Sequence, residues 1–323
     1  MAELLEIRDL SVEIMSTRGL VHAVRGVNLT VEAGSIHGIV GESGCGKSVT
    51  SRSILRLYDK RYVRTRGQIL FDGQDLLECS EKQMQKIRGK QISMIFQDPM
   101  TALNPLYKVG DQIAEVYTRH FGDSRKEARK KALEMLELVG IPGDRSGDYP
   151  HQFSGGMKQR VVIAMALACS PELILADEPT TALDVTIQAQ ILDMIKALKE
   201  KQNTSMILIT HDLGVVAEVC DRVAVVYAGE IIEYGTKEEI FDYPTHPYTV
   251  GLFGSIPKIH EDVEWLDSIP GMPPNPADLP SGCHFHPRCS KCTQPCGEKA
   301  PEMVEIRPGH FVRCLNCTEK KES

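Results

Sequence analysis

The stretch Gly41-Glu-Ser-Gly-Cys-Gly-Lys-Ser48 fits the pattern G-x-x-x-x-G-K-[ST] and decides the fold of this chain. It follows an apolar run at residues 36–40, typical of a buried strand, and precedes a helical pattern at 49–58. The glycines let successive backbone N–H groups face an anion, and the N-terminus of the following helix favours negative charge. The flanking strand and helix favour a phosphate-binding loop over a chance glycine-rich turn.

We therefore predict that this loop binds a nucleoside triphosphate with Mg²⁺. Lys47 would reach the β- and γ-phosphates, and the hydroxyl of Ser48 would ligate Mg²⁺. Further nucleotide contacts are expected from the rest of the loop and the start of the helix, at Gly41, Ser43, Gly44, Cys45, Gly46 and Val49.

Two adjacent carboxylates, Asp177 and Glu178, follow the apolar run at 173–176. Asp177 would hold the hydrated Mg²⁺, and Glu178 would polarise a water for in-line attack on the γ-phosphate. Taken alone, an Asp-Glu pair after a strand is more often a capped turn. Together with the phosphate-binding loop, the pair favours hydrolysis.

A second anion-binding helix start is predicted at Phe153-Ser-Gly-Gly-Met-Lys-Gln-Arg160, about 110 residues after the first. Ser154 would be the N-cap, and Gly155 and Gly156 would open the helix. An ordinary capped helix is the alternative. The chain would then have two helix starts that bind phosphate but only one phosphate-binding loop. The simplest explanation is that the helix start at Ser154 contacts a nucleotide held by another subunit, which predicts a working dimer.

Composition is that of an ordinary globular protein. The 323 residues contain 37 Lys and Arg and 44 Asp and Glu, a formal net charge of −7, which argues against a protein that coats nucleic acid. Hydrophobic residues make up 42%, which excludes general disorder. The longest apolar run, at 161–176, contains Pro171 and Glu172, so we expect no membrane span. The N-terminus lacks the layout of a signal peptide, and we expect a cytoplasmic protein.

Short β-branched runs alternate with helical patterns, which predicts an α/β fold. The expected strands lie at 36–40, 68–71, 92–96, 173–176, 206–210 and 222–227. Beyond Pro99 the pattern changes to helices, which indicates a helical insertion at about 98–170. Its expected helices lie at 109–120, at 125–139 and after Ser154.

The ordered motifs resemble the nucleotide-binding subunit of ATP-binding cassette (ABC) transporters. Besides the elements above, the chain has Gln97 after a predicted strand, Ala182-Leu-Asp184 and Thr210-His-Asp212. The resemblance implies that Gln97 contacts Mg²⁺ and the attacking water while sensing the membrane partner. It also implies that His211 holds the γ-phosphate and that Asp184 communicates across the dimer. Glu178, His211 and Gln97 would then be the catalytic residues, with ATP and Mg²⁺ bound.

The same resemblance implies the domain organisation. The fold would be a P-loop NTPase of the ABC cassette type, with a RecA-like core, an antiparallel β subdomain and a helical subdomain at about 98–170. We expect the cassette at residues 1–254 and a small Pro- and Cys-rich extension at 255–323. Such families usually stack adenine on an aromatic residue near the first strands, but residues 12–18 contain none. Met15 or Arg18 could pack on the base instead, which predicts loose base selectivity.

Six of the ten cysteines crowd into the last 41 residues. By spacing alone, Cys289-x₂-Cys292 and Cys314-x₂-Cys317 are close to a structural zinc pattern, with His284 and His286 as further candidate ligands. A short, proline-rich tail cannot bury enough apolar surface to fold alone, so a metal would act as its staple.

The tail also resembles the C-terminal extension of the peptide-importer branch of ABC transporters. In that branch four cysteines are thought to hold a 4Fe-4S cluster, and the matching residues here are Cys283, Cys289, Cys296 and Cys314. Cys292 and Cys317 would be extra. Thiolates suit both metals, so ligand type does not choose between them. We favour the cluster over zinc, and either over free thiols.

Residues 210–231 and 243–249 are very similar to ATPase subunits of dipeptide and oligopeptide importers. The resemblance implies a peripheral protein on the cytoplasmic face of the membrane that couples ATP hydrolysis to peptide uptake. Its partners would be a second ABC ATPase subunit, identical or different, two permeases and, indirectly, an extracellular solute-binding protein, with no nucleic acid. An importer of nickel or another small solute is the alternative. A soluble non-transport ABC ATPase is less favoured, because the chain has one cassette and no long coiled coil.

Overall fold

The computed structural model describes residues 3–17, 19–179, 185–254 and 269–318. The chain forms two compact units, and each is described by itself. Unit 1 comprises Met1–Leu4, Val31–Ile36 and Glu78–Ile209, and unit 2 comprises Leu5–Thr30, His37–Leu77 and Thr210–Ser323.

The core of unit 1 is three parallel strands in the order β8-β7-β6. They span Ile92–Ile95 (β6), Leu173–Asp177 (β7) and Ser205–Ile209 (β8), and every residue in them is buried. Parallel strands covered on both faces need near-continuous apolar sequence, which is why the sequence indicated them. All three predicted strands are confirmed, with ends that differ by one residue.

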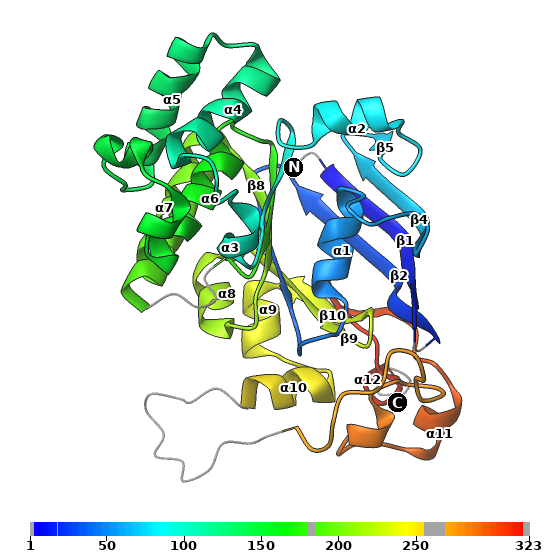
Figure 1. Cartoon of the computed structure of the whole chain (residues 1–323). Helices are drawn as coiled ribbons and strands as arrows, with labels where there is room; N and C mark the ends of the chain where they lie inside the picture. The colour runs from blue at the N-terminus through cyan, green and yellow to red at the C-terminus, as the bar shows by residue number, and fades with distance from the viewer. Residues whose placement is uncertain (1–2, 18, 180–184, 255–268, 319–323) are drawn as a thin grey trace. The chain divides into compact units, whose positions relative to one another are not determined.

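Helices make up the rest of unit 1, and α4, α5 and α6 pack on one another (Figure 1). Two helices begin with a capping box, in which Ser80 opens α2 and Ser124 opens α5. The predicted helical insertion is confirmed in its helices. The helices are α2 (Glu81–Ile87), α3 (Pro99–Ala102), α4 (Val109–Phe121), α5 (Arg125–Leu138), α6 (Gly155–Leu167) and α7 (Val185–Gln202), with 3-10 turns at Gly143–Gly147 and Pro150–Gln152.

Unit 2 contains a four-stranded antiparallel sheet in the order β2-β1-β4-β5. Its strands are β1 (Glu3–Ser16), β2 (Gly19–Glu32), β4 (Val63–Phe71) and β5 (Gln74–Asp75). Of these, the strand analysis had placed only residues 68–71. The period-two pattern of β1 is interrupted because the register with β4 shifts between Arg8 and Ser11, where Asp9 has φ +49°.

A second sheet in unit 2 has the strand order β11-β12-β10-β9-β3. β3 and β9 are parallel, as expected for strands either side of a crossover, whereas β9, β10, β12 and β11 pair antiparallel in turn. The bounds are β3 (Ile36–Val40), β9 (Arg222–Tyr227), β10 (Glu230–Thr236), β11 (Val304–Arg307) and β12 (His310–Val312). The two predicted strands, β3 and β9, are confirmed.

Residues 269–318, hereafter the C-terminal segment, therefore add two strands to this sheet, and Figure 1 shows the segment beside β9 and β10. The sequence analysis had treated the tail as a separate extension without strands. The helices of unit 2 are α1 (Lys47–Ile54), α8 (Leu213–Val219), α9 (Lys237–Asp242), α10 (Pro247–Gly254), α11 (Gln294–Glu298) and α12 (Leu315–Thr318), with a 3-10 turn η3 (His286–Arg288).

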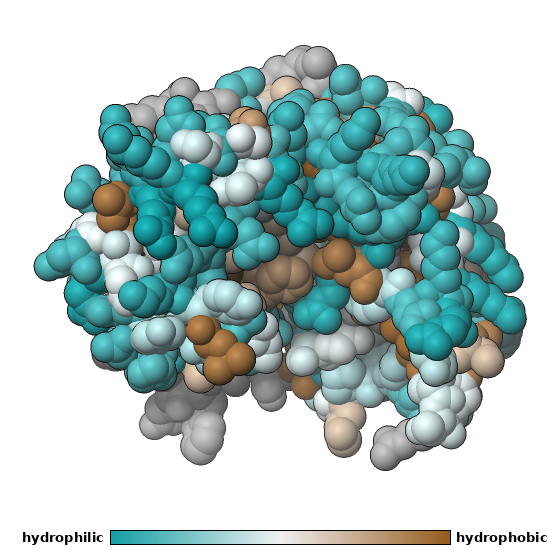
Figure 2. Space-filling view, turned by 45° about the horizontal axis from the view of Figure 1, so that its top comes forward, coloured by the Kyte–Doolittle hydropathy of each residue, from teal (hydrophilic) through white to brown (hydrophobic). Residues whose placement is uncertain are grey.

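Hydrophobic residues form small, separate patches on the mostly hydrophilic face drawn in Figure 2. Of the described helices, none combines the length and the apolar character needed to cross a bilayer. In unit 1, the segment after β6 carries several large exposed apolar side chains, namely Met100, Leu106 and Tyr107.

Candidate functional site

The predicted phosphate-binding loop connects β3 to α1 in unit 2, and two of its glycines have no room for a side chain. A Cβ atom on Gly41 would lie 2.2 Å from the carbonyl oxygen of Val226, and one on Gly46 would lie 2.3 Å from that of Ala23. Both residues also have positive φ, +150° and +104°. Glycine is therefore required where the loop leaves β3 and where it enters α1.

Lys47 begins α1 and is almost fully buried. Its Nζ donates to the carbonyl oxygens of Gly41, at 2.7 Å, and Glu42, at 2.8 Å. These two bonds bring the ammonium group back against the first residues of the loop. The Nζ of Lys47 also lies 3.7 Å from Sγ of Cys45. A buried cation whose partners are carbonyl oxygens and a thiol attracts an anion strongly.

Two residues that sequence analysis missed, Tyr248 and Arg288, hold the start of this loop at Glu42. The backbone N–H of Glu42 donates to the hydroxyl of Tyr248 at 2.9 Å. The Glu42 carboxylate accepts two bonds from the guanidinium of Arg288, at 2.7 and 3.0 Å. The available signal was Glu42 itself, since a carboxylate inside an anion-binding loop calls for a cation partner.

In unit 1, the structure brings Gln97 and Glu178 together. Asp177 ends β7 and is fully buried, and Glu178 follows it with φ +49°, a conformation that non-glycine residues rarely adopt. The backbone N–H of Glu178 donates to the carbonyl of Ile209 at 2.8 Å. Its carboxylate accepts a 2.8 Å bond from Nε2 of Gln97, which follows β6. The strained backbone and this bond fix the direction of the carboxylate.

Ser154 is the N-cap of α6, as the sequence predicted. Its Oγ accepts a hydrogen bond from the backbone N–H of Met157 at 3.3 Å. Ser154 and Gly155 are exposed, so the start of this thirteen-residue helix faces solvent within unit 1. An exposed helix N-terminus with a glycine in its first turn leaves backbone N–H groups open to an anion.

The remaining predicted residues are placed as follows. His211 is exposed in unit 2, directly before Asp212, which is the N-cap of α8. Met15, a candidate for adenine packing, is 54% exposed. Arg18 and Asp184 lie outside the described residues.

The four cysteines matched to a cluster lie in one neighbourhood of unit 2. Burial raises the pKa of Cys283 to about 11, with smaller contributions in the same direction from the thiols of Cys314, Cys296 and Cys289. A hydrogen bond from Cys317 lowers the pKa of Cys314 to about 6. Within residues 3–17, 19–179, 185–254 and 269–318, however, no three His, Cys, Asp or Glu side chains stand in a geometry that could hold a metal ion. Cysteine thiols are suitable metal ligands, but the described thiols do not form a closed ligand shell.

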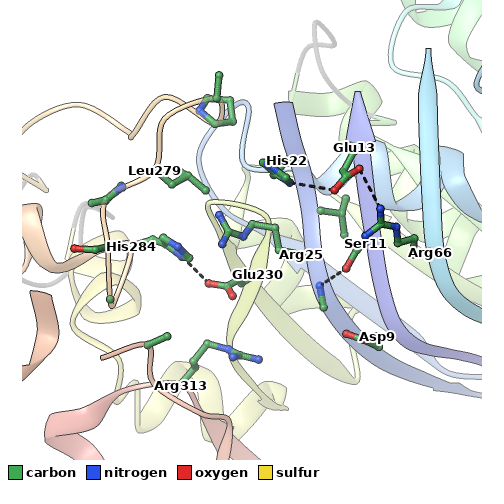
Figure 3. Close-up of a pocket in the computed structure, with 18 of the residues that line it drawn as sticks. Asp9, Ser11, Glu13, His22, Arg25, Arg66, Glu230, Leu279, His284 and Arg313 are labelled. Carbon is green, nitrogen blue, oxygen red and sulfur yellow. Dashed lines mark hydrogen bonds and ion pairs between the residues drawn. The ribbon is translucent and has the colours of Figure 1, made fainter. Parts of the chain in front are cut away.

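A polar pocket of unit 2 opens between β1, β2 and the C-terminal segment (Figure 3). Nδ1 of His22 lies 3.6 Å from a carboxylate oxygen of Glu13, and Nδ1 of His284 is hydrogen-bonded to Glu230 at 2.8 Å. The backbone N–H of His22 also donates to the carbonyl of Pro276 at 3.3 Å. These contacts tie the C-terminal segment to the antiparallel sheet and to the start of β10.

Comparisons with known proteins agree with the motifs along the whole chain. The family described as "ABC transporter" matches residues 24–181, and the family described as "Oligopeptide/dipeptide transporter, C-terminal region" matches residues 232–296. The oligopeptide transport ATP-binding protein OppD of Bacillus subtilis (strain 168) is 54% identical over 96% of this chain and 88% of its own. The chain belongs to the ATP-binding subunits of ABC peptide transporters. The resemblance stated from the sequence is confirmed.

Other similar proteins support the same family assignment. The dipeptide transport ATP-binding protein DppD of the same organism is 53% identical over 97% of this chain and 95% of its own. Among solved structures, the dimeric post-hydrolysis form of the ATP-binding cassette MJ0796 bound to ADP and Pi has a TM-score of 0.66 and 28% identity. It covers 72% of this chain and 99% of its own. The ABC cassette fold is therefore confirmed.

Proposed function

We propose that this protein is the ATP-hydrolysing subunit of an importer of dipeptides or oligopeptides. The observation that carries the proposal is the similarity to oligopeptide and dipeptide transport ATP-binding proteins over nearly the whole length of both chains. The subunit is peripheral, on the cytoplasmic face of the membrane, and works with two permeases and, indirectly, a solute-binding protein. A cassette at residues 1–254 carries the nucleotide, and an extension follows at 255–323.

Residues of the phosphate-binding loop hold MgATP in this proposal. The role of Lys47 in phosphate binding is supported by its burial against the loop, because a buried positive charge is stabilised by a bound anion. The hydroxyl of Ser48 and the carboxylate of Asp177 ligate Mg²⁺, together with Gln97. The remaining contacts come from Gly41, Ser43, Gly44, Cys45, Gly46 and Val49.

Hydrolysis uses Glu178 to polarise the attacking water. The 2.8 Å hydrogen bond from Gln97 supports this role, because the neutral amide orients the carboxylate without neutralising its negative charge. His211 holds the γ-phosphate and orients the attack. The shell is completed by Ser154, Gly155 and Gly156 of a second ATPase subunit, since their helix start is open to solvent in unit 1.

Cys283, Cys289, Cys296 and Cys314 are proposed to hold a 4Fe-4S cluster, with Zn²⁺ as the alternative. Support comes from four thiols in one neighbourhood of a proline-rich segment. When bound, the group would supply a structural staple. Anaerobic purification followed by iron, sulfide and zinc analysis tests this. About four irons and four sulfides per chain are expected, whereas stoichiometric zinc without iron contradicts the cluster.

The transport function is tested by reconstituting the chain in vesicles with its neighbouring permeases, solute-binding protein and second ATPase. A di- or oligopeptide should raise the ATPase rate. The peptide should accumulate inside vesicles whose ATPases face the lumen and which are loaded with ATP, and not inside the same vesicles without ATP. Stimulation by Ni²⁺ and not by any peptide would favour the alternative cargo. ATPase activity indifferent to every permease would favour a soluble ABC ATPase.

A further inference from the structure

The phosphate-binding loop contains a carboxylate, Glu42, whose negative charge lies within a loop predicted to bind a triphosphate. Glu42 is the second residue of the loop, and its backbone carbonyl already accepts a bond from Lys47. An uncompensated negative charge at this position would repel the phosphates of ATP. The loop therefore needs a cation at Glu42 that the loop itself does not supply, because Lys47 is turned to backbone oxygens.

The C-terminal segment supplies that cation. Arg288 meets the Glu42 carboxylate with both ends of its guanidinium, through Nη1 to Oε2 at 2.7 Å and Nη2 to Oε1 at 3.0 Å. A planar guanidinium matches a carboxylate in this two-point geometry, which a lysine cannot reproduce. The Arg288 side chain is 6% exposed and that of Glu42 27%, so the guanidinium is largely shielded from water and the carboxylate partly.

Further contacts hold the guanidinium in place. Its Nε donates to the carbonyl of Pro270 at 2.9 Å, and Nη1 lies 3.4 Å from the hydroxyl of Tyr227. Phe285, three residues before Arg288, packs edge-on against Tyr227 and Tyr248, with ring centroids 5.2 and 5.4 Å apart. Tyr248 is fully buried and accepts the N–H of Glu42, so one aromatic cluster supports both the arginine and the loop.

We propose that Arg288 is a positioning residue for ATP binding, which braces the phosphate-binding loop and neutralises Glu42. The affinity of the site for MgATP then depends on the fold of the C-terminal segment, including the turn between Cys283 and Cys289 that carries Arg288. This inference rests on the proposed nucleotide function and extends it to a segment outside the cassette motifs.

Substitution of Arg288 by Met tests the brace while keeping an apolar stem. We expect the Kd and KM for MgATP to rise on the order of tenfold, the effect of about 1.4 kcal/mol, with kcat at saturating ATP changed by less than about twofold. The matched control is Arg307→Met, because Arg307 also lies in the C-terminal segment, pairs with Glu239 and stacks on Tyr243. This control should bind MgATP like wild type.

The double variant Arg288→Met with Glu42→Gln separates charge from general damage. Removal of the unpaired carboxylate should restore most of the MgATP affinity, which a purely structural role of Arg288 does not predict. An Arg288→Met protein that is folded and binds MgATP like wild type overturns the inference. A double variant as weak as Arg288→Met overturns the neutralising role. A wild-type chain that bound no MgATP would overturn the proposed function and this inference with it.

Wild-type protein provides a second test that needs no substitution. Coupling between two sites is reciprocal, so MgATP must stabilise the turn at 283–289 if that turn stabilises the loop. Amide hydrogen exchange of residues 283–289 should slow when MgATP binds, whereas exchange at 304–312 should not change. Equal exchange rates at 283–289 with and without bound MgATP would overturn the brace.

Discussion

At the scale of a single residue, Glu178 has a constrained backbone and an oriented side chain. Its backbone has φ +49°, its N–H is fixed to Ile209, and its carboxylate accepts from Gln97. Strain of this kind costs on the order of 1–3 kcal/mol and persists where the surrounding structure over-determines it. Motif order in the sequence predicts catalytic roles for both Glu178 and Gln97, but not the backbone strain, because no local sequence pattern encodes a left-handed glutamate after a strand.

Substitution of Glu178 by Gln should abolish hydrolysis and leave nucleotide binding intact. A carboxamide has nearly the same shape but cannot accept the proton of the attacking water, so kcat should fall by about 10² to 10⁴-fold. ATPase rates and MgATP affinity measured on the same preparation check this. The control is Glu172→Gln, the same substitution at an exposed position just before β7. Wild-type hydrolysis in Glu178→Gln would remove this carboxylate from the mechanism.

At the scale of elements, the sequence predicted those strands and helices whose apolar residues follow a continuous local pattern. The buried strands β3, β6, β7, β8 and β9 and the helices α4 and α5 were found because each repeats apolar residues with its own period. β1 was missed as a whole, because its period-two pattern is interrupted where its register with β4 shifts. β11 and β12 were missed because three- or four-residue strands carry little periodicity. The carboxylate of Glu42 indicates that a cation is needed, but no local pattern identifies Arg288, 246 positions away, as that cation.

The start of α6 offers a prediction about one helix end. Ser154→Ala removes the N-cap bond to Met157 and should cost about 1 kcal/mol of stability. It should also weaken the MgATP-dependent association of two cassettes, measured by light scattering in the Glu178→Gln background. Ser124→Ala is the matched control, since Ser124 caps α5 in the same way. Equal association by Ser154→Ala and Ser124→Ala would argue that Ser154 serves only as a cap.

Across the molecule as a whole, unit 2 contains a buried histidine that couples stability to pH. Burial lowers the pKa of His246 from 6.5 to about 4, and its Nδ1 accepts a 3.0 Å bond from the N–H of Tyr248. The ring is therefore neutral in the folded state. As pH falls below 6.5, the unfolded chain gains a proton that the folded chain does not, so stability is lost progressively until pH approaches 4.

Substitution of His246 by Asn keeps an acceptor for Tyr248 and removes the titration. The free energy of unfolding, measured by urea titration, should fall by about 3 kcal/mol more in wild type than in His246→Asn between pH 7 and pH 4. Between pH 7 and pH 8 the two proteins should show the same pH dependence. Parallel curves over the entire acid range would mean that His246 does not hold this depressed pKa.

The whole account depends on an ATP bound jointly by two subunits, one giving the loop of Lys47 and the other the helix start of Ser154. The most direct measurement is the structure of the assembled transporter with Glu178→Gln and trapped MgATP. We predict that Ser154 Oγ lies within about 3 Å of the γ-phosphate of the nucleotide held by the opposite ATPase subunit. Separated cassettes, with Ser154 in contact with no nucleotide while MgATP occupies the loop, would contradict the account.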